Sequence, residues 1–446
     1  MAVRLIDSTS RPPPRLAYLT GFEGTPIHDS GTNILETTLH TERYRTDLIQ
    51  LKADGLQKFR ACIPWPSIER APGEYDWDWT DRYMGLVRKL HLTPIVDPCH
   101  HTGTPSWLAD GYLNPAFPER LESFVRAFAE RYPWVKWYTC INEPYATAAL
   151  AGFCGVWYPY RTGHESLIPM LLNMSRGICL VTEMLIDTVP GVRFLHTDSC
   201  EHHQALDTRS RYHAWKSNRL RFSVLDLISG KLDRTHPLYW LFRKHGMTRE
   251  DVSWFKDHPA RIDILGLDYY PIHEAGWNVS GRSEEIRPLG FKEVALQYAD
   301  HSGLPIMLSE TNIRGYVEDR ITWLKYMVLE CEALVPELAA RGIPFEGFCW
   351  YPYIDSTDWC SMVCQANGHI DPQGIYWLSP GTLNRNASEL SDVYVSLASG
   401  TISGSDIPSY AFHTGALDIC QVRKFLPLLA DWEWREILDR EHAFAD

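Results

Sequence analysis

The stretch Ile262-Asp263-Ile264-Leu265-Gly266-Leu267 is an almost unbroken apolar run. Runs of this kind are typical of parallel β-strands that are covered on both faces. Pro305-Ile306-Met307-Leu308 has the same character, and similar short runs recur along the chain. Together they predict eight strands, over residues 16–22, 59–64, 92–98, 135–141, 192–198, 263–270, 304–309 and 345–350.

The segments between these strands carry the period of amphipathic helices. Over 83–90 and over 121–128 apolar residues are spaced i, i+3, i+4, i+7. Eight alternations of strand and helix predict an α/β fold, a (β/α)8 TIM barrel, with its active site at the C-terminal ends of the strands. We expect one domain over 1–446. Residues 381–446 are expected to form a C-terminal segment packed on the barrel, with a helical tail over 416–438.

The composition is compatible with a neutral substrate. The net charge of -13 argues against nucleic acid or an anionic membrane as a partner. The 17 Trp and 22 Tyr suit a carbohydrate site, because sugar C–H faces pack on flat rings. Eleven scattered Cys, an N-terminus without an apolar stretch and no run approaching the length of a membrane span predict a cytoplasmic protein. Apolar residues in the tail allow a homo-oligomer.

Two glutamates stand at the ends of predicted strands. Glu143 follows the fourth strand, beside Asn142, and Glu310 ends the seventh. Strands four and seven lie on opposite sides of a barrel mouth, so the two carboxyl groups could face each other across a bound sugar. Retaining glycosidases need such a pair about 5–5.5 Å apart, one carboxyl protonated and the other ionised. The pair therefore predicts glycoside hydrolysis.

The segment Asn142-Glu143-Pro144 resembles the Asn-Glu-Pro signature of glycoside hydrolase family 1. Further segments between about residues 14 and 380 are similar to motifs of that family in the same order. They are 44–48 with 59–68, 101–108, 266–270, 309–312 and 350–359. The resemblance implies a retaining β-glycosidase of the β-glucosidase or β-galactosidase type.

The resemblance also assigns roles at the reacting centre. Glu143 would be the general acid/base and Glu310 the nucleophile. Arg60 would hold Glu310 as an anion, and Tyr270 would donate a hydrogen bond to it, whereas Tyr269 is expected in the core.

Other residues would bind the sugar. Asn142 would contact the 2-hydroxyl group, and His101 another hydroxyl group. Trp350 would be a platform under the ring, and Asp358 and Trp359 would line the non-reducing end. Glu23 is the nearest match to the first-strand Gln of the family.

Several positions depart from the family pattern, so the reaction type is better defined than the sugar. They are Glu23, Thr102, Asp268, Ile313 and Asp358, with the last motif one residue longer than usual. We expect no cofactor and no metal, because Cys360, Cys364 and His369 lack further ligands at zinc-like spacing. Alternatives are a transglycosylase using the same site, an enzyme of the same clan acting inside polysaccharides, and a non-catalytic carbohydrate-binding barrel.

Overall fold

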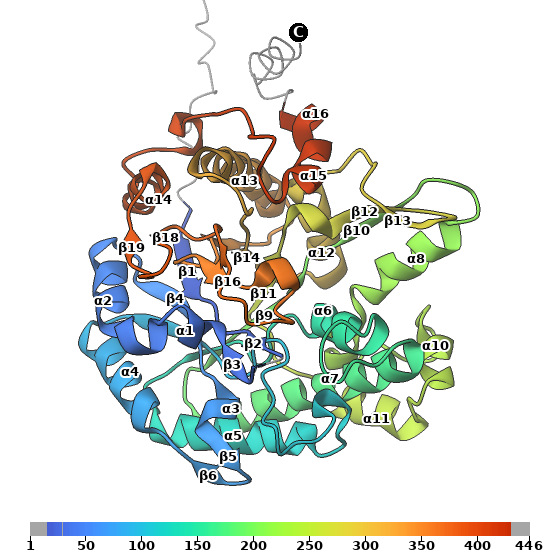
Figure 1. Ribbon diagram of the computed structural model, residues 1–446. Helices are drawn as coiled ribbons and strands as arrows, with labels where there is room; N and C mark the ends of the chain where they lie inside the picture. Colours follow the sequence, from blue (N-terminus) through green and yellow to red (C-terminus); the bar gives the residue numbers. More distant parts are fainter. Residues whose placement is uncertain (1–15, 29, 430–446) are drawn as a thin grey trace, which may run out of the picture.

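Eight parallel strands close into a barrel in the computed structural model, which describes residues 16–28 and 30–429 (Figure 1). The strands follow one another around the barrel in sequence order, and the predicted (β/α)8 barrel is confirmed. They are β1 (Tyr18–Phe22), β4 (Lys58–Cys62), β7 (Thr93–Asp97), β8 (Trp137–Tyr138), β9 (Arg193–Ser199), β11 (Ile264–Asp268), β14 (Ile306–Glu310) and β15 (Phe345–Cys349).

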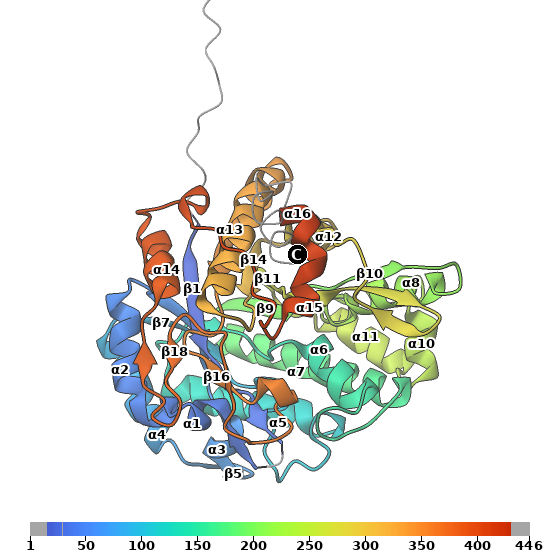
Figure 2. The same cartoon turned by 45° about the horizontal axis from the view of Figure 1, so that its top comes forward.

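Helices between the strands surround the barrel (Figure 2). The larger ones are α2 (His40–Ala53), α4 (Asp78–Lys89), α5 (Phe117–Arg131), α7 (His164–Thr188), α11 (Arg249–Asp257), α12 (Phe291–Ser302), α13 (Val317–Ala340) and α14 (Glu389–Ser399). The shorter ones are α1 (Ile34–Thr37), α3 (Trp65–Ile68), α6 (Pro144–Ala148), α8 (Arg211–Leu220), α9 (Ser223–Ile228), α10 (Tyr239–Lys244), α15 (Ile419–Val422) and α16 (Leu426–Leu429).

Short antiparallel strand pairs lie in the segments between the barrel strands and helices. They are β2 (Pro26–Ile27) with β3 (Thr32–Asn33), β5 (Glu69–Ala71) with β6 (Glu74–Tyr75), β16 (Ser356–Thr357) with β17 (Ile370–Asp371), and β18 (Trp377–Leu378) with β19 (Arg385–Asn386). A three-stranded sheet beside α8 contains β10 (His202–Ala205), β12 (Glu274–Asn278) and β13 (Gly281–Ser283).

The barrel interior is filled in layers. Leu19, Ile95, Leu195, Ile264 and Met307 belong to one buried cluster low in the barrel. Because side chains alternate along a strand, the residues two positions further on also point inward and form the next layer toward the mouth. That layer carries polar groups.

Glycine at position 21 makes room for this polar layer. A methyl group on Gly21 would lie 2.6 Å from the Tyr351 ring and 2.8 Å from Cβ of Arg60. Separations this short cannot be accommodated without shifting the backbone, so Gly21 allows the Arg60 side chain to lie across the barrel.

The helix α7 is long and apolar enough to cross a membrane by length and composition alone, contrary to the expectation from sequence. Two-thirds of its most apolar window is buried within the structure, and α7 packs against α5 and α9. A core helix of a barrel passes the same test.

The C-terminal segment is described as far as residue 429, and the remainder of the expected tail over 416–438 lies outside the described residues. α14 lies beside α13 in both ribbon views (Figures 1 and 2). Tyr394 of α14 donates a hydrogen bond to Leu19 O and accepts one from Trp350 N at 3.1 Å. The segment therefore contacts the ends of β1 and β15.

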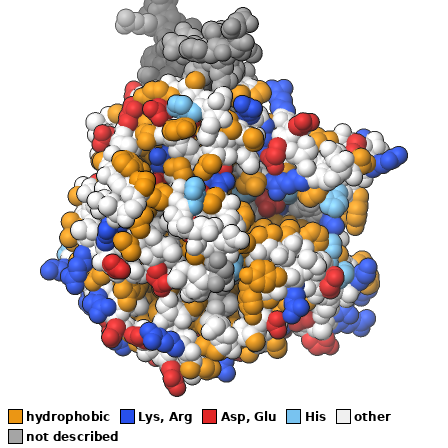
Figure 3. All heavy atoms as spheres, viewed as in Figure 1, with side chains coloured by type: hydrophobic (Ala, Val, Ile, Leu, Met, Phe, Trp, Pro, Cys, Tyr) orange, Lys and Arg blue, Asp and Glu red, His pale blue; other side chains and the backbone are white. Residues whose placement is uncertain are grey.

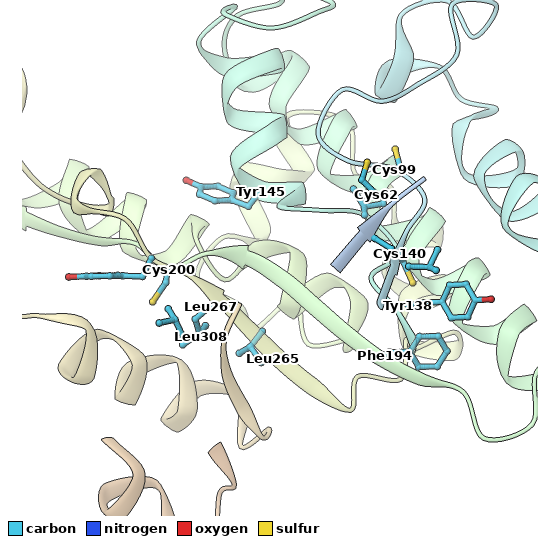
Figure 4. Packing of buried hydrophobic residues seen from close by; sticks show 14 of the residues in the cluster. Cys62, Cys99, Tyr138, Cys140, Tyr145, Phe194, Cys200, Leu265, Leu267 and Leu308 are labelled. Atoms are coloured by element: carbon cyan, nitrogen blue, oxygen red, sulfur yellow. The ribbon is translucent and has the colours of Figure 1, made fainter. Parts of the chain in front are cut away.

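All eleven cysteines are free thiols. Cys62, Cys99 and Cys140 are buried and lie among apolar side chains near the barrel (Figure 4). On the face in view, acidic and basic side chains are interspersed with hydrophobic ones (Figure 3).

Candidate active site

Glu143 and Glu310 line the same cavity, which has a volume of about 340 Å³. Glu143 precedes α6 with a left-handed backbone (φ 42°), and Pro144 occupies the first helical position. Glu310 is the last residue of β14. Both side chains are buried, and the charge of Glu310 acts directly on Glu143. The two carboxyl groups predicted from sequence therefore line one cavity.

Both oxygens of Glu310 receive a hydrogen bond. Arg60 Nη1 donates to Oε1, and the Tyr270 hydroxyl group donates to Oε2 at 2.7 Å. Charge-assisted donors of this kind favour the ionised carboxylate. Tyr269 is fully buried and bonds to Glu274, so the expected alternation of the two tyrosines is confirmed.

Glu143 lies in an environment that keeps it protonated. Burial raises its pKa well above the usual range, and the charges of Asp268, Glu310 and Asp198 raise it further. Its Oε1 has no hydrogen-bond partner among the described residues. A buried carboxyl group with a raised pKa can hold a proton for transfer.

Asn142 shares the guanidinium group of Arg60 with Glu310. Its Oδ1 accepts hydrogen bonds from Arg60 and, at 3.0 Å, from Thr197 Oγ1. Within the described part of the chain its Nδ2 has no partner. The amide is therefore oriented with its donor free, although Asn142 is not among the residues that line the cavity.

Glu23 is an ionised carboxylate at the end of β1. Its Oε1 accepts hydrogen bonds from Thr25 N at 2.9 Å and Thr25 Oγ1 at 2.6 Å. His100 Nε2 lies 3.1 Å from the same oxygen. Although burial alone would raise the pKa of Glu23, His100 and Thr25 lower it to about 2.

His100 continues into a chain of alternating charges. Its Nδ1 lies 2.5 Å from Asp97 Oδ2, and Arg60 Nη2 lies 3.6 Å from the same oxygen. Burial disfavours the charged imidazole, but Asp97 and Glu23 raise the pKa of His100 to about 10. Buried anions and cations therefore alternate from Glu310 to Glu23, two residues that line the cavity, in the order Glu310, Arg60, Asp97, His100, Glu23.

His101 is held as a neutral ring. Burial and the neighbouring positive His100 keep its pKa well below the usual range. Its Nδ1 lies 3.2 Å from Thr147 Oγ1, and its Nε2 lies 3.9 Å from Glu143 Oε2. Trp157 and Trp359 lie beside it with ring centroids 5.0 Å and 5.9 Å away, and all three line the cavity. These flat rings suit contact with a sugar face.

Besides Asn142, two more of the predicted sugar-binding residues do not line this cavity. Trp350 is fully buried and donates its indole N–H to Gln373 O at 2.9 Å. Asp358 is also fully buried, and its carboxylate accepts backbone N–H groups of residues 367–369. The sequence-based placement of both is therefore corrected, and Tyr351 and Gln373 line the cavity instead.

Sequence reasoning missed two buried acids, Asp97 and Asp198, and gave no role to a third, Asp268. Asp97 and Asp268 stand two and four positions after Ile95 and Ile264, so their inward direction follows from strand alternation. Asp198 accepts the N–H groups of Tyr145 at 3.0 Å and Ala146 at 3.4 Å at the start of α6. An acid at the end of each predicted strand is the signal that could have found them.

The pKa values of Asp268 and Asp198 are raised, as that of Glu143 is. Burial, followed by the charge of Glu310, raises the pKa of Asp268 well above its usual range. Burial raises the pKa of Asp198 to about 7. Ser309 Oγ donates to Asp268 Oδ1 at 2.6 Å, and Oδ2 has no partner among the described side chains and backbone.

The cavity is also lined by residues that follow α6 and by the turn after β11. Leu150, Trp157, Pro271 and Ile272 give this part apolar walls. Arg314, at the rim, is ion-paired with Asp418 at 2.7 Å.

No family model matches this chain. β-Glucosidase A of Acetivibrio thermocellus is 23% identical over 402 residues, which are 78% of this chain and 84% of that protein. β-Glucosidase A of Thermotoga maritima is 21% identical over 427 residues, covering 82% and 91%. The 6-phospho-β-galactosidase of Lacticaseibacillus rhamnosus is 24% identical over 255 residues, covering 51% and 52%.

The solved family 1 β-glucosidase of Thermotoga maritima superposes with a TM-score of 0.71 at 16% identity, covering 87% of this chain and 98% of that one. The resemblance to glycoside hydrolase family 1 is confirmed. The same Thermotoga enzyme in complex with castanospermine gives a TM-score of 0.72. The loop from 350 to 373 departs from the pattern that the motifs led us to expect.

Proposed function

We propose that this protein is a retaining β-glycosidase acting on terminal β-linked sugars. The observation that carries the proposal is the contrast between two glutamates that line one cavity. Glu310 is bonded to Arg60 and Tyr270, while Glu143 is buried and its pKa is raised even though the charge of Arg60 opposes the shift. Relatives named β-glucosidase support the same reaction.

In the first step Glu310 attacks the anomeric carbon, and the C–O bond to the leaving group breaks as Glu143 gives its proton to that oxygen. The glycosyl ester neutralises Glu310, so the pKa of Glu143 falls and it becomes a carboxylate. In the second step Glu143 takes a proton from water, whose oxygen attacks the anomeric carbon and releases Glu310. The two inversions give net retention.

The glycone is proposed to be unphosphorylated. Glu23 and Glu310 place two carboxylates in the cavity, and its neighbouring His101 is neutral. Arg314 is ion-paired with Asp418. Arg282, the other arginine that lines the cavity, is paired with Glu284. A sugar phosphate would therefore meet carboxylates and only cations that already have an anionic partner, and we expect aryl β-glucosides or β-galactosides to be turned over faster than their 6-phosphates.

The test is chemical rescue of Glu310→Ala with azide. Turnover of an aryl β-glycoside should be abolished, and azide should restore it and yield the α-glycosyl azide, identified by NMR. A 2-deoxy-2-fluoro glycoside should add its glycosyl mass to the peptide containing Glu310 in wild type. Glu337→Ala, at an exposed position of α13, is a matched control that should keep activity. Wild-type inactivity over a panel of sugars, with sugar binding intact, would favour the non-catalytic barrel.

Transglycosylation at the same site is the second candidate, favoured by the apolar walls of Leu150, Trp157, Pro271 and Ile272. An apolar alcohol added as acceptor should then divert product from free sugar to alkyl glycoside. Exclusive release of free sugar at high acceptor concentration would count against it.

We also propose a cytoplasmic location, supported by eleven cysteines that are all free thiols. Cell fractionation followed by immunodetection tests it.

A further inference from the structure

A short hairpin beside the cavity places three metal-binding side chains together. β16 pairs antiparallel with β17, with Ser356 opposite Asp371 and Thr357 opposite Ile370. His369 and Asp371 are two positions apart, so they face the same side of an extended chain. Cys360 returns toward them from the turn after β16, and its backbone N–H donates to Asp371 Oδ2 at 3.3 Å.

The donor atoms of these residues converge. The thiol sulfur of Cys360, a ring nitrogen of His369 and a carboxylate oxygen of Asp371 all lie within 4.8 Å of one another. Asp371 is fully buried, whereas Cys360 and His369 are exposed. The buried carboxylate of Asp371 and the two exposed donor side chains together leave room for a water molecule as a further ligand.

The backbone that carries the ligands is fixed by other contacts. Asp358 N donates to His369 O at 2.8 Å, and His369 N donates to Asp358 Oδ1 at 3.0 Å. Arg314 Nη1 lies 3.5 Å from Asp371, while its Nε and Nη2 donate to Asp418. The carboxylate of Asp358, which sequence analysis assigned to sugar binding, thus holds the loop that presents His369.

We propose that Cys360, His369 and Asp371 bind a zinc ion, with water as a fourth ligand. A thiolate, an imidazole and a carboxylate form the mixed sulfur, nitrogen and oxygen set that zinc takes in tetrahedral sites. Sequence analysis expected no metal because Cys360, Cys364 and His369 lacked further ligands at zinc-like spacing, and Asp371 supplies one. On binding, the Cys360 proton passes to solvent and the sulfur bonds to the metal.

The site would act on the loop and not on the reacting bond. Trp359 and Met362 flank Cys360 in sequence and line the sugar cavity. Met362 O accepts the indole N–H of Trp157 at 2.8 Å, which ties this loop to the opposite wall. A bound zinc ion would therefore fix the position of two residues that line the substrate cavity, and we expect it to alter KM more than kcat.

Cobalt titration of the full-length, metal-stripped protein tests the site without reference to turnover. Wild type should develop a thiolate-to-cobalt charge-transfer absorption and the visible bands of four-coordinate cobalt, both removed by added zinc. Cys360→Ser should lose the charge-transfer band, and His369→Asn should weaken binding at least about 10-fold, a lower bound taken from losses at outer-shell partners. Cys420→Ser, which removes another exposed thiol, should bind as wild type does.

Zinc should also raise the Tm of wild type and of Cys420→Ser, and not that of Cys360→Ser, since a ligand stabilises only the folded state that binds it. A cobalt spectrum without thiolate absorption, or unchanged binding by Cys360→Ser, would overturn the proposal. Both readouts are independent of glycoside turnover, so a failure of the proposed glycosidase function leaves them unaffected.

Discussion

Glu23 follows β1 and Glu143 follows β8, three strands further around the barrel, and the two glutamates are almost equally buried, at 7% and 8% exposure. Their pKa values nevertheless move in opposite directions. That of Glu23 falls to about 2, and that of Glu143 rises well above the usual range. Burial raises both, so burial cannot explain the difference.

The difference lies in the neighbouring charges. Glu23 contacts His100, which Asp97 holds in the charged form, and Arg60 links that group to Glu310. Around Glu143 the neighbours are two further acids, Asp268 and Asp198. One side of the mouth alternates anions with cations, and the other collects carboxyl groups that favour a proton. We call the second group the acid side and the first the paired side, and Asp268 adjoins both, since it pairs with Glu310 in the sheet register.

On the acid side, the largest loss of activity is expected for Glu143→Gln. With alkyl glycosides, whose leaving groups need a proton, we expect kcat/KM to fall about 10²–10⁴-fold. Aryl glycosides with acidic leaving groups should lose much less. The raised pKa predicts that wild-type activity declines as pH rises through the pKa of Glu143, and this alkaline limb should vanish in the variant.

Steady-state kinetics over a series of leaving groups checks this prediction. Glu165→Gln, an exposed carboxyl group at the start of α7, serves as the control. Equal losses for good and poor leaving groups would remove Glu143 from the acid role.

On the paired side, the informative substitution is His100→Asn, which removes the cation between Asp97 and Glu23. The pKa of Glu23 should rise, so an acidic limb should appear in kcat/KM, with a loss of about 10-fold per 1.4 kcal/mol of lost interaction. Substrates that lack a hydroxyl group contacted by Glu23 should lose less in the variant than the intact sugar does. An unchanged acidic limb would show that His100 does not control Glu23.

The same substitution should lower the free energy of unfolding by an amount that depends on pH. The depressed pKa of Glu23 contributes stability above about pH 4.5 that is lost as pH falls toward about 2. The raised pKa of His100 contributes stability below 6.5 that is lost as pH rises toward about 10. Denaturant unfolding should therefore show the largest difference from wild type between about pH 4.5 and 6.5. A difference that grows steadily with pH would contradict the pairing.

A smaller effect is expected from Asp198→Asn. The pKa of Asp198 is raised to about 7, so above neutral pH it is an anion that keeps the proton on Glu143. Its removal should move the alkaline limb of kcat/KM to lower pH, with less than about a 10-fold loss at neutral pH, since one pKa unit corresponds to about 1.4 kcal/mol. Glu143→Gln/Asp198→Asn is the control, because without Glu143 the second substitution should leave the pH profile flat.

Much of this arrangement could be predicted from the sequence, because strand ends and strand alternation place side chains before any contact is known. Continuous apolar runs located the barrel strands, the end of β14 located Glu310, and the segment between β8 and α6 contains Glu143. Arg60 stands two positions after Lys58, whose side chain lines the bottom of the barrel. Because residues two apart in a strand face the same side, Arg60 also points inward.

The last loop could not be predicted in this way. Its motif is one residue longer than the family pattern, and in extended chain a shift of one residue turns a side chain to the other face. Cys349 belongs to the barrel interior together with Tyr351, so Trp350 between them points outward. Asp358 then bonds to backbone amides instead of a sugar. A match between motifs does not show which way each side chain points. The direction follows from the backbone, including the hairpin of β16 and β17.

The least disruptive change on the acid side should be Asp268→Asn. Asp268 is fully buried, lies next to Glu310 in the sheet register, and its pKa is raised by burial and by that anion. If it is neutral at working pH, an amide of the same shape keeps the bond from Ser309 and leaves both charge and volume unchanged. We expect kcat/KM within about 3-fold of wild type, a change of less than about 1 kcal/mol, and an unmoved alkaline limb. Asp268→Ala, which empties the space without changing its charge, separates packing from protonation. If the limb instead moves to lower pH in Asp268→Asn, Asp268 carries a charge in the resting enzyme, and the two sides of the mouth differ less than their contacts indicate.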